Sequence, residues 1–475
     1  MLFNSLDFGV FLVIVFTMYW AIGNKRRVAQ NVLILIASYI FYGLWDWRFL
    51  SLIIGSSLVD YMAALYLHRS DKKGIRRFWM GFSLFWNLGV LFVFKYMNFF
   101  LDNFYSLFNL EVIPGEYTIW NIIIPVGLSF YTFQTLGYTI DVYRKKLEPT
   151  TNLLNFLCFV SFFPQLVAGP IERANFLLPQ FMKQRNFDYT KAKDGLRQIL
   201  WGLFKKILVA DKLGIAVSMV FNEPENYGTS MMWYASLLFF FQLYCDFSGY
   251  TDIAIGTAKL FGFKLNINFK TPFLSFSVRD FWRRWHITLT NWFIDYVYKP
   301  IVSRGTESNK LLPAVGILFT MVLVGAWHGA NWTFIVFGLI NGLIVIGEQI
   351  PLFKGKITLH KKLKSLPKPV SLLYFYFIAT VMCMFFRSED ISQSFLILKR
   401  MFTWVPGDFS LLIGVKIIFL LIMLIAETAM RHLDFPLQNL ELKLPRPVRW
   451  AVYYLLVFGI IRFYEPLQAF IYFQF

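Results

Sequence analysis

Long apolar runs that recur along the whole chain are the strongest constraint on its fold. One of them covers residues 311–347 and contains no Asp, Glu, Lys or Arg in 37 residues. A helix needs about 20 apolar residues to cross a bilayer, so runs of this kind are long enough to span one. The chain is 57% hydrophobic and only 16% charged, against about 25% charged in a typical soluble domain. These features predict an all-α, polytopic membrane protein.

The charges between the apolar runs predict how the chain is oriented. Segments 23–30, 68–77 and 143–146 are rich in Lys and Arg, and they alternate with a near-neutral turn and with the acidic segment 99–116. Basic loops remain on the cytoplasmic side of a membrane, so we expect an extracytoplasmic N-terminus. The first apolar run has no basic segment before it, which favours a retained helix over a cleaved signal peptide.

We expect about ten or eleven transmembrane helices, together with re-entrant and interfacial helices. Linkers are short, so one membrane domain over residues 1–475 is predicted. Within it, residues 1–119 are expected to form scaffold helices, residues 120–350 the catalytic core and residues 351–475 the C-terminal helices. The core is assigned to the middle because its apolar blocks hold more polar and ionisable residues.

The motif VGAWHGANW places a histidine, His328, inside the charge-free run. The apolar arm before it is only 14 residues, about 21 Å of helix, so a bend at residues 325–329 is expected within the membrane. Irregular backbone at that depth is tolerated where protein or a water-filled cavity surrounds it. His328 is therefore predicted to line an internal cavity. There it either transfers protons or makes a purely structural hydrogen bond.

The motif SFSVRDFWRRWHITLTNWF holds the second candidate histidine, His286. On one continuous helix, Trp282 and His286 would share a face, and Asp280 would pair with Arg284 four residues later. The tryptophans and arginines also suit an interfacial anchor helix. That alternative explains the motif apart from its histidine.

The remaining ionisable residues have less specific interpretations. Asp246 and Asp252 are six residues apart, which separates them by about 120° around a helix, so we expect them to bind arginines or cap helices, with a break at Gly249. Three scattered cysteines and the lack of a Cys/His cluster favour no metal site. The net charge of +18 fits basic loops facing anionic lipid or a phosphorylated donor equally well.

Five motifs occur in a fixed order, and together they resemble the membrane-bound O-acyltransferase superfamily. The resemblance is closest to its bacterial branch, which includes the membrane subunit of alginate O-acetyltransferase. The motifs are PVGLSFYTFQTLGYTIDVYR, FFPQLVAGPIERANFLLPQF, DFSGYTDIAIG, FLSFSVRDFWRRWHITLTNWF and GAWHGANWTFIVFGLING.

This resemblance implies a ring of membrane helices around a central tunnel and an O-acetyltransferase activity. It assigns the catalytic role to His328 in the WHG motif and names His286 in the FWRRWH motif as the second signature position. The candidate substrate-binding or supporting residues are Trp327, Asn331, Asp280, Arg283, Trp285 and Asp252. Among them, Trp327 and Asn331 are expected to stabilise an oxyanion.

The resemblance also implies substrates and partners. Acetyl-CoA or another cytoplasmic thioester is the expected donor, no cofactor is expected to be bound, and an exported polysaccharide such as alginate is the acceptor. An extracytoplasmic SGNH-type acyltransferase is the expected partner, in a bacterial cell membrane. D-Alanyl transfer to teichoic acid from a carrier protein and membrane transport are the alternatives.

Overall fold

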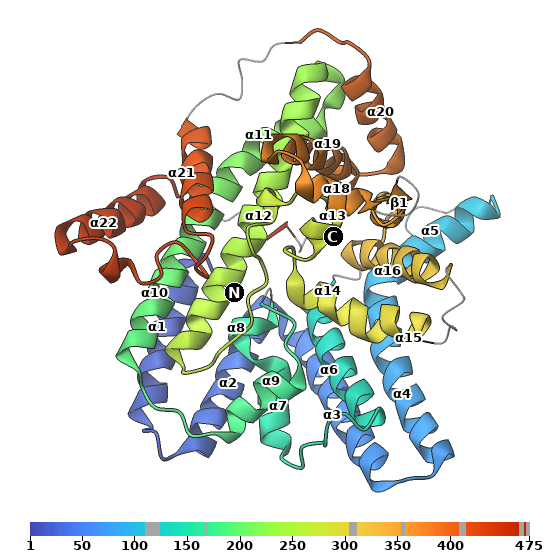
Figure 1. The fold of residues 1–475 in the computed structure, drawn as a ribbon. Coiled ribbons are helices and arrows are strands. Elements are labelled where there is room, and N and C mark those ends of the chain that lie inside the picture. Colours follow the sequence, from blue (N-terminus) through green and yellow to red (C-terminus); the bar gives the residue numbers. More distant parts are fainter. Residues whose placement is uncertain are drawn as a thin grey trace. The chain divides into compact units, whose positions relative to one another are not determined.

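The computed structural model describes residues 1–109, 124–167, 169–303, 311–352, 357–407, 415–464 and 470–471. In these ranges the chain is almost entirely helical (Figure 1). The one sheet that they contain pairs two short antiparallel strands, β1 (Pro351–Leu352) and β2 (Ile357–Thr358). The expected all-α class is therefore confirmed.

The described chain divides into two compact units. The first comprises Met1–Lys193 and Thr257–Asn266, and the second comprises Asp194–Gly256 and Ile267–Phe475. The division at residue 193 falls inside the predicted core of residues 120–350. The single membrane domain and its three parts stay a prediction.

Nine α-helices lie wholly within the described residues of the first unit. They are α1 (Leu6–Ala21), α2 (Arg27–Asp46), α3 (Leu50–Arg69), α4 (Lys73–Leu91), α5 (Met97–Leu107), α6 (Leu128–Tyr143), α7 (Leu153–Ser161), α8 (Phe163–Leu166) and α9 (Ala174–Met182). Short turns η1 (Trp47–Phe49) and η2 (Phe92–Tyr96) join some of them directly.

A buried carboxylate, Asp60 on α3, holds three helices of the first unit together. It accepts hydrogen bonds from Ser83 and, at 2.8 Å, from Asn87 on α4, and also from Thr139 on α6 at 2.8 Å. A buried polar group is tolerated when hydrogen bonds satisfy it. This network gives Asp60 a structural role.

The second unit contains most of α10 (Tyr189–Leu203) and α12 (Thr229–Leu260), which cross the boundary between units. Its other helices are α11 (Asp211–Asn222), α13 (Val278–Trp282), α14 (Ile287–Phe293), α15 (Lys299–Val302), α16 (Leu312–His328), α17 (Trp332–Gly347), α18 (Leu359–Ser365), α19 (Lys368–Arg387), α20 (Ile391–Phe402), α21 (Val415–Ala429) and α22 (Arg446–Arg462). It also contains the π-helices η4 (Phe204–Ala210) and η7 (Ile294–Tyr298) and the 3₁₀-helices η5 (Pro224–Asn226), η6 (Pro272–Leu274) and η9 (Leu440–Leu442).

One expected helix break does not occur, and another starts only at the last residue of its predicted range, 325–329. Gly249 does not interrupt α12. Instead, it lets α12 approach α10, because a Cβ at Gly249 would lie 2.8 Å from the carbonyl oxygen of Gly202. Gly325 likewise lies inside α16, and the chain turns only after His328, so the expected bend begins four residues later.

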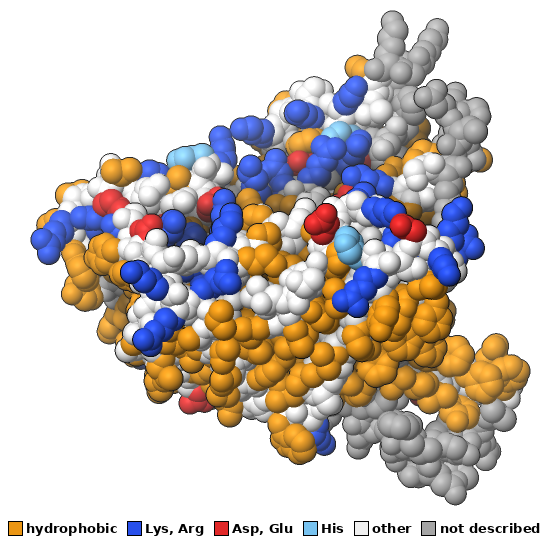
Figure 2. Space-filling model, turned by 90° about the horizontal axis from the view of Figure 1, so that it is seen from below, with side chains coloured by type: hydrophobic (Ala, Val, Ile, Leu, Met, Phe, Trp, Pro, Cys, Tyr) orange, Lys and Arg blue, Asp and Glu red, His pale blue; other side chains and the backbone are white. Residues whose placement is uncertain are grey.

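The apolar helices are of two lengths. Three helical stretches in the described ranges, Arg27–Arg69, Lys73–Leu107 and Lys368–Arg387, are long and apolar enough to cross a membrane, and five shorter apolar helices accompany them. The expected count of ten or eleven spans stays a prediction. Figure 2 shows wide areas of exposed hydrophobic side chains on one face, as lipid contact requires, together with a predominance of Lys and Arg among the charged groups.

Candidate active site

The two candidate histidines both contact one indole ring in the second unit, that of Trp327. The Trp327 ring centroid lies 4.9 Å from the His328 ring and 5.7 Å from the His286 ring, and it is nearly parallel to His286 at 26°. The structure therefore brings together three residues that the sequence placed in two separate motifs, with Trp327 in contact with both imidazoles.

His328 is the last residue of α16 and is 3% exposed. Its ring lies among the aromatic rings of Phe386, at 4.9 Å, and Phe337, at 6.1 Å. α16 and α17 pack closely enough that a Cβ at Gly325 would lie 2.2 Å from the carbonyl oxygen of Phe334. This close hairpin fixes the backbone that carries His328.

His328 lines a small cavity of about 50 Å³. The wall includes Trp282 and Trp285 from the FWRRWH motif, Asn341 from α17 and one side of α19. Among the described residues that line the cavity there is no Asp, Glu, Lys or Arg. His328 thus borders a cavity as predicted, and the cavity is predominantly apolar.

His286 is fully buried and stands immediately before α14 rather than on a helix with Trp282. The shared helical face that the sequence suggested is therefore wrong. His286 has φ +40°, a left-handed conformation that is uncommon for a non-glycine residue. Asn268 holds the following turn, since its carbonyl accepts from Ile287 N–H at 2.9 Å and its side chain accepts from the Thr288 hydroxyl at 2.9 Å.

Glu348 anchors α13, the helix that precedes His286. Its buried carboxylate accepts hydrogen bonds from the backbone N–H groups of Val278 at 2.8 Å and Arg279 at 2.9 Å. A carboxylate is favourable at a helix N-terminus, where N–H groups lack partners within the helix. The predicted pair of Asp280 with Arg284 is confirmed at 2.9 Å, and it also ties α13 to the turn that leads to His286.

A second cavity, of about 220 Å³, is also lined by Trp282. Arg279 and Arg283 contribute to its wall, which is otherwise mostly apolar. Nearby His360 on α18 lies 2.9 Å from the Ser277 hydroxyl, and burial together with the guanidinium groups of Arg279 and Arg283 lowers its pKa. The arginines thus place positive charge beside a cavity that shares one wall with the His328 cavity.

The other predicted site residues occupy different positions. Trp285 is buried, stacks on Phe281 at 5.3 Å and lines the His328 cavity. Asn331 caps α17 by accepting from Thr333 N–H at 3.0 Å, and its amide donates to the Glu389 carbonyl at 2.7 Å. These bonds give Asn331 a structural function, and its expected part in stabilising an oxyanion is not tested by them.

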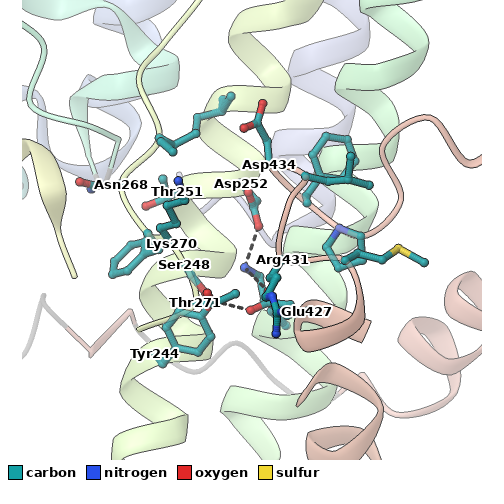
Figure 3. A pocket seen from close by; sticks show the side chains of 18 of the residues that line it. Tyr244, Ser248, Thr251, Asp252, Asn268, Lys270, Thr271, Glu427, Arg431 and Asp434 are labelled. Carbon is teal, nitrogen blue, oxygen red and sulfur yellow. Dashed lines mark hydrogen bonds and ion pairs between the residues drawn. The ribbon is translucent and has the colours of Figure 1, made fainter. Parts of the chain in front are cut away.

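Asp252 lines a third cavity, of about 150 Å³, which contains polar side chains and which neither His286 nor His328 lines. Its carboxylate is 2.7 Å from the ammonium of Lys205, which is also 3.3 Å from Glu427 (Figure 3). Gln198 donates to the same aspartate at 2.9 Å. The partner of Asp252 is thus a lysine rather than the expected arginine.

The adjacent Lys206 makes a second buried cluster. Its ammonium lies 2.6 Å from Asp246 and 2.8 Å from Asp211, and all three residues are buried. The two aspartates of α12 therefore bind different lysines, in agreement with the expectation that they do not form one paired-carboxylate site.

Sequence reasoning missed Glu348, Glu427 and the contribution of α19. A signal was present for the carboxylates, because an ionisable residue at the end of or within an apolar run is costly and needs a specific reason. Glu348 directly follows the charge-free run, and Glu427 lies in the apolar segment of α21. For α19 the wall-forming role depends on long-range packing, for which the sequence gives no local signal.

Comparison with known proteins shows the family of this chain. A family model described as MBOAT, membrane-bound O-acyltransferase family, matches residues 34–388. The chain is 32% identical over 433 residues to the peptidoglycan O-acetyltransferase of Helicobacter pylori, covering 84% of this chain and 80% of that protein. It is 34% identical over 419 residues to a probable alginate O-acetylase of Pseudomonas putida, covering 86% and 82%.

A teichoic acid D-alanyltransferase of Streptococcus thermophilus is more distant. It is 28% identical over 298 residues, which cover 57% of this chain and 69% of that protein. These relatives are acyltransferases and support that activity over the transporter alternative, whereas the acceptors in their names differ. The family match extends over most of the chain. The chain therefore belongs to the membrane-bound O-acyltransferase family, and it is a multi-pass membrane enzyme that transfers an acyl group from a donor to an acceptor.

Proposed function

We propose that this enzyme takes an acetyl group from a cytoplasmic thioester, acetyl-CoA, and passes it across the membrane for O-acetylation of an exported polysaccharide. The observation that carries the proposal is the buried imidazole of His328 in the wall of an apolar cavity. The indole of Trp327 contacts both this imidazole and that of His286. The acceptor polymer is alginate or a related exopolysaccharide, or peptidoglycan. The relatives support both classes.

His328 acts as a general base. Its imidazole takes the proton of an acceptor hydroxyl, the hydroxyl oxygen forms a bond to the thioester carbonyl carbon, and the carbon–sulfur bond then breaks. The protonated imidazole returns the proton to the departing thiolate, so the ring ends the cycle neutral. A route through an acyl group carried on His328 uses the same cavity and ends in the same products.

The surroundings of His328 favour this step. An apolar cavity excludes water that would hydrolyse the thioester, and fixed walls hold the two reactants at short range. Trp327 keeps the two imidazoles at fixed distances from its ring. In this arrangement His286 orients a substrate or relays the proton.

The cavity beside Arg279 and Arg283 suits the donor. Its apolar wall fits an extended thioester arm, and guanidinium groups bind phosphate oxygens, often in pairs. Because this cavity shares Trp282 with the His328 cavity, a donor held there has its reactive end near His328. In the cell, an extracytoplasmic SGNH-type acyltransferase then receives the acetyl group, with the enzyme in the bacterial cell membrane and its N-terminus outside.

Mass analysis of exported polysaccharide and cell wall, from cells with and without this protein, tests the proposal. We expect acetyl esters that depend on the protein. These esters should vanish in the His328→Ala variant at equal membrane abundance. His68→Ala, at an exposed histidine in the last turn of α3, is the matched control and should retain full acetylation. Acetylation that survives His328→Ala would eliminate the base, and D-alanyl esters would favour the teichoic acid alternative.

A further inference from the structure

Two cavities of unequal size meet at Trp282. The larger cavity, of about 220 Å³, has the two arginines in its wall, and the smaller one, of about 50 Å³, has His328. The indole N–H of Trp282 donates to the side-chain oxygen of Asn341 at 3.3 Å, and Asn341 in turn donates to the Phe337 carbonyl at 2.8 Å. These bonds hold the shared wall in place, so the smaller cavity has a defined size.

The smaller cavity is suited by volume to a group of only a few heavy atoms. An apolar cavity of about 150 Å³ is large enough for benzene, and about 10–15 Å³ is the minimum for one water. At about 50 Å³, the space beside His328 lies between these limits. A two-carbon acyl group fits such a space, whereas each added methylene requires displacement of the wall.

The chemistry of the wall makes a second selection. Buried charge without a partner is strongly unfavourable, and a D-alanyl group carries an ammonium. The cavity wall, as far as the structure describes it, offers no carboxylate, and the one amide, Asn341, is already bonded to Trp282 and Phe337. An uncharged acyl group is therefore favoured over an aminoacyl group.

One side of α19 forms much of this wall. Its lining residues lie three, four, seven, eight and eleven positions after Phe375, and this spacing places them on one helical face. They are Phe375, Ile378, Ala379, Met382, Cys383 and Phe386. Since α19 lies outside the core that the sequence predicted, its face is a new element of the site.

We propose that this face of α19, together with Trp282, is the acyl-selecting wall of the enzyme. It admits acetyl to His328 and excludes larger or positively charged acyl groups. The inference rests on the proposed function, because it assumes that the acyl group is transferred at His328. Phe375 and Met382 set the depth of the space, and Ala379 leaves it open because its side chain is a single methyl.

The test compares acyl groups in living cells that lack their own copy of this protein. Cells that express the wild type or a variant are fed propionate, so that acetyl-CoA and propionyl-CoA are both present. Ester-bound acids are then released from exported polysaccharide and cell wall by mild base and quantified. One methylene in an apolar pocket is worth about 10-fold to 200-fold in selectivity, so the wild type should yield acetate almost exclusively.

Enlarging variants should change the ratio of the two acids, and a filling variant should change their total yield. Phe375→Leu and Met382→Ala should raise the propionate-to-acetate ratio about tenfold or more, and Ala379→Leu should lower the yield of both acids. Phe377→Leu is the matched control, because Phe377 lies on the same helix with a side chain that is 50% exposed. Its ratio should equal that of the wild type.

The outcomes separate the two proposals. One outcome would overturn the selecting wall and leave the proposed function intact. In it, the wild type yields protein-dependent acetate, and the propionate-to-acetate ratio stays unchanged in the enlarging variants at equal membrane abundance. If an enlarging variant does not accumulate, Ala379→Leu decides, since undiminished acetylation there contradicts the wall. Absence of any protein-dependent ester in the wild type would refute the proposed function, and D-alanine in the ester fraction would contradict the charge selection.

Discussion

Two regions of the second unit each contain a group of buried ionisable side chains, and they differ in whether those side chains have charged partners. Around η4, Lys205 and Lys206 each lie between two carboxylates, at distances from 2.6 to 3.3 Å. Around Trp327, the imidazoles of His286 and His328 lie among aromatic rings instead. The first region is rich in charge and the second is almost without it.

This contrast distinguishes buried groups that stabilise the fold from buried groups that are suited to catalysis. A buried charge that is fully paired is costly to disturb and has little free capacity to react. An imidazole in an apolar cavity is suited to exchange a proton with a substrate, and the adjacent volume admits one. The region that lacks charge is accordingly the better candidate for catalysis, although the clusters contain more ionisable residues.

The largest effect is expected at His328. His328→Gln retains a polar side chain of similar size but removes the base, and general base catalysis contributes about 10²-fold to 10⁴-fold to a rate. Acyl transfer by the purified enzyme, or ester content in cells, should fall by that range while membrane abundance stays near normal. A rate within a few-fold of the wild type would remove His328 from the chemistry.

The lysine clusters should show the opposite pattern. Lys206→Met leaves Asp211 and Asp246 buried without their shared cation, which costs about 3–5 kcal/mol when one partner of a buried pair is removed. The thermal midpoint in detergent should drop sharply. The exposed pair of Lys191 with Asp188 provides the control, and Lys191→Met should change stability by less than about 1 kcal/mol. Equal effects at the two lysines would contradict the structural role of the buried cluster.

His286 should give an intermediate loss of activity. Asn tolerates the left-handed backbone that His286 adopts, so His286→Asn removes the imidazole with little change in the turn. Loss of the ring that packs against Trp327 should lower acyl transfer about 100-fold, which is the effect of a small misplacement of reacting groups. A thermal midpoint that stays close to that of the wild type would confirm that the loss is functional, and a full rate would make His286 purely structural.

The smallest effect concerns the hairpin that carries His328. Gly325→Ala places a methyl group where the Phe334 carbonyl lies, and overpacking of this kind costs about 1–3 kcal/mol. Gly347→Ala, in the same hairpin with open space around its Cα, should not destabilise the protein. If the two variants have the same thermal midpoint, α16 and α17 do not pack this closely.

Local patterns were sufficient for some features and not for others. Continuous apolar runs predicted the helices, and the histidine in a charge-free run predicted a cavity beside His328. The pairing of Asp280 with Arg284 followed from helical spacing. By contrast, the left-handed backbone at His286 depends on contacts with Asn268, which is 18 residues earlier in the chain, and no helical pattern contains that information.

Long-range packing accounts for most of what the sequence left open. Gly249 was interpreted as a helix breaker because glycine often is one, whereas its role is close approach between α10 and α12. Glu427 contacts Lys205 across more than two hundred residues of chain. The α19 wall likewise forms only when that helix packs against α13 and α17.

The most direct test of the account measures ester-bound acyl groups on exported polymer per molecule of membrane-embedded enzyme in two variants. The first is His328→Gln, and the second is the neutralised cluster Lys206→Met/Asp211→Asn/Asp246→Asn, which replaces the buried lysine together with both of its carboxylate partners. The account predicts that the first variant loses its esters and that the second retains them on each molecule that accumulates. Retention in the first variant and loss in the second would show that the reaction takes place among the charges and not at the histidines.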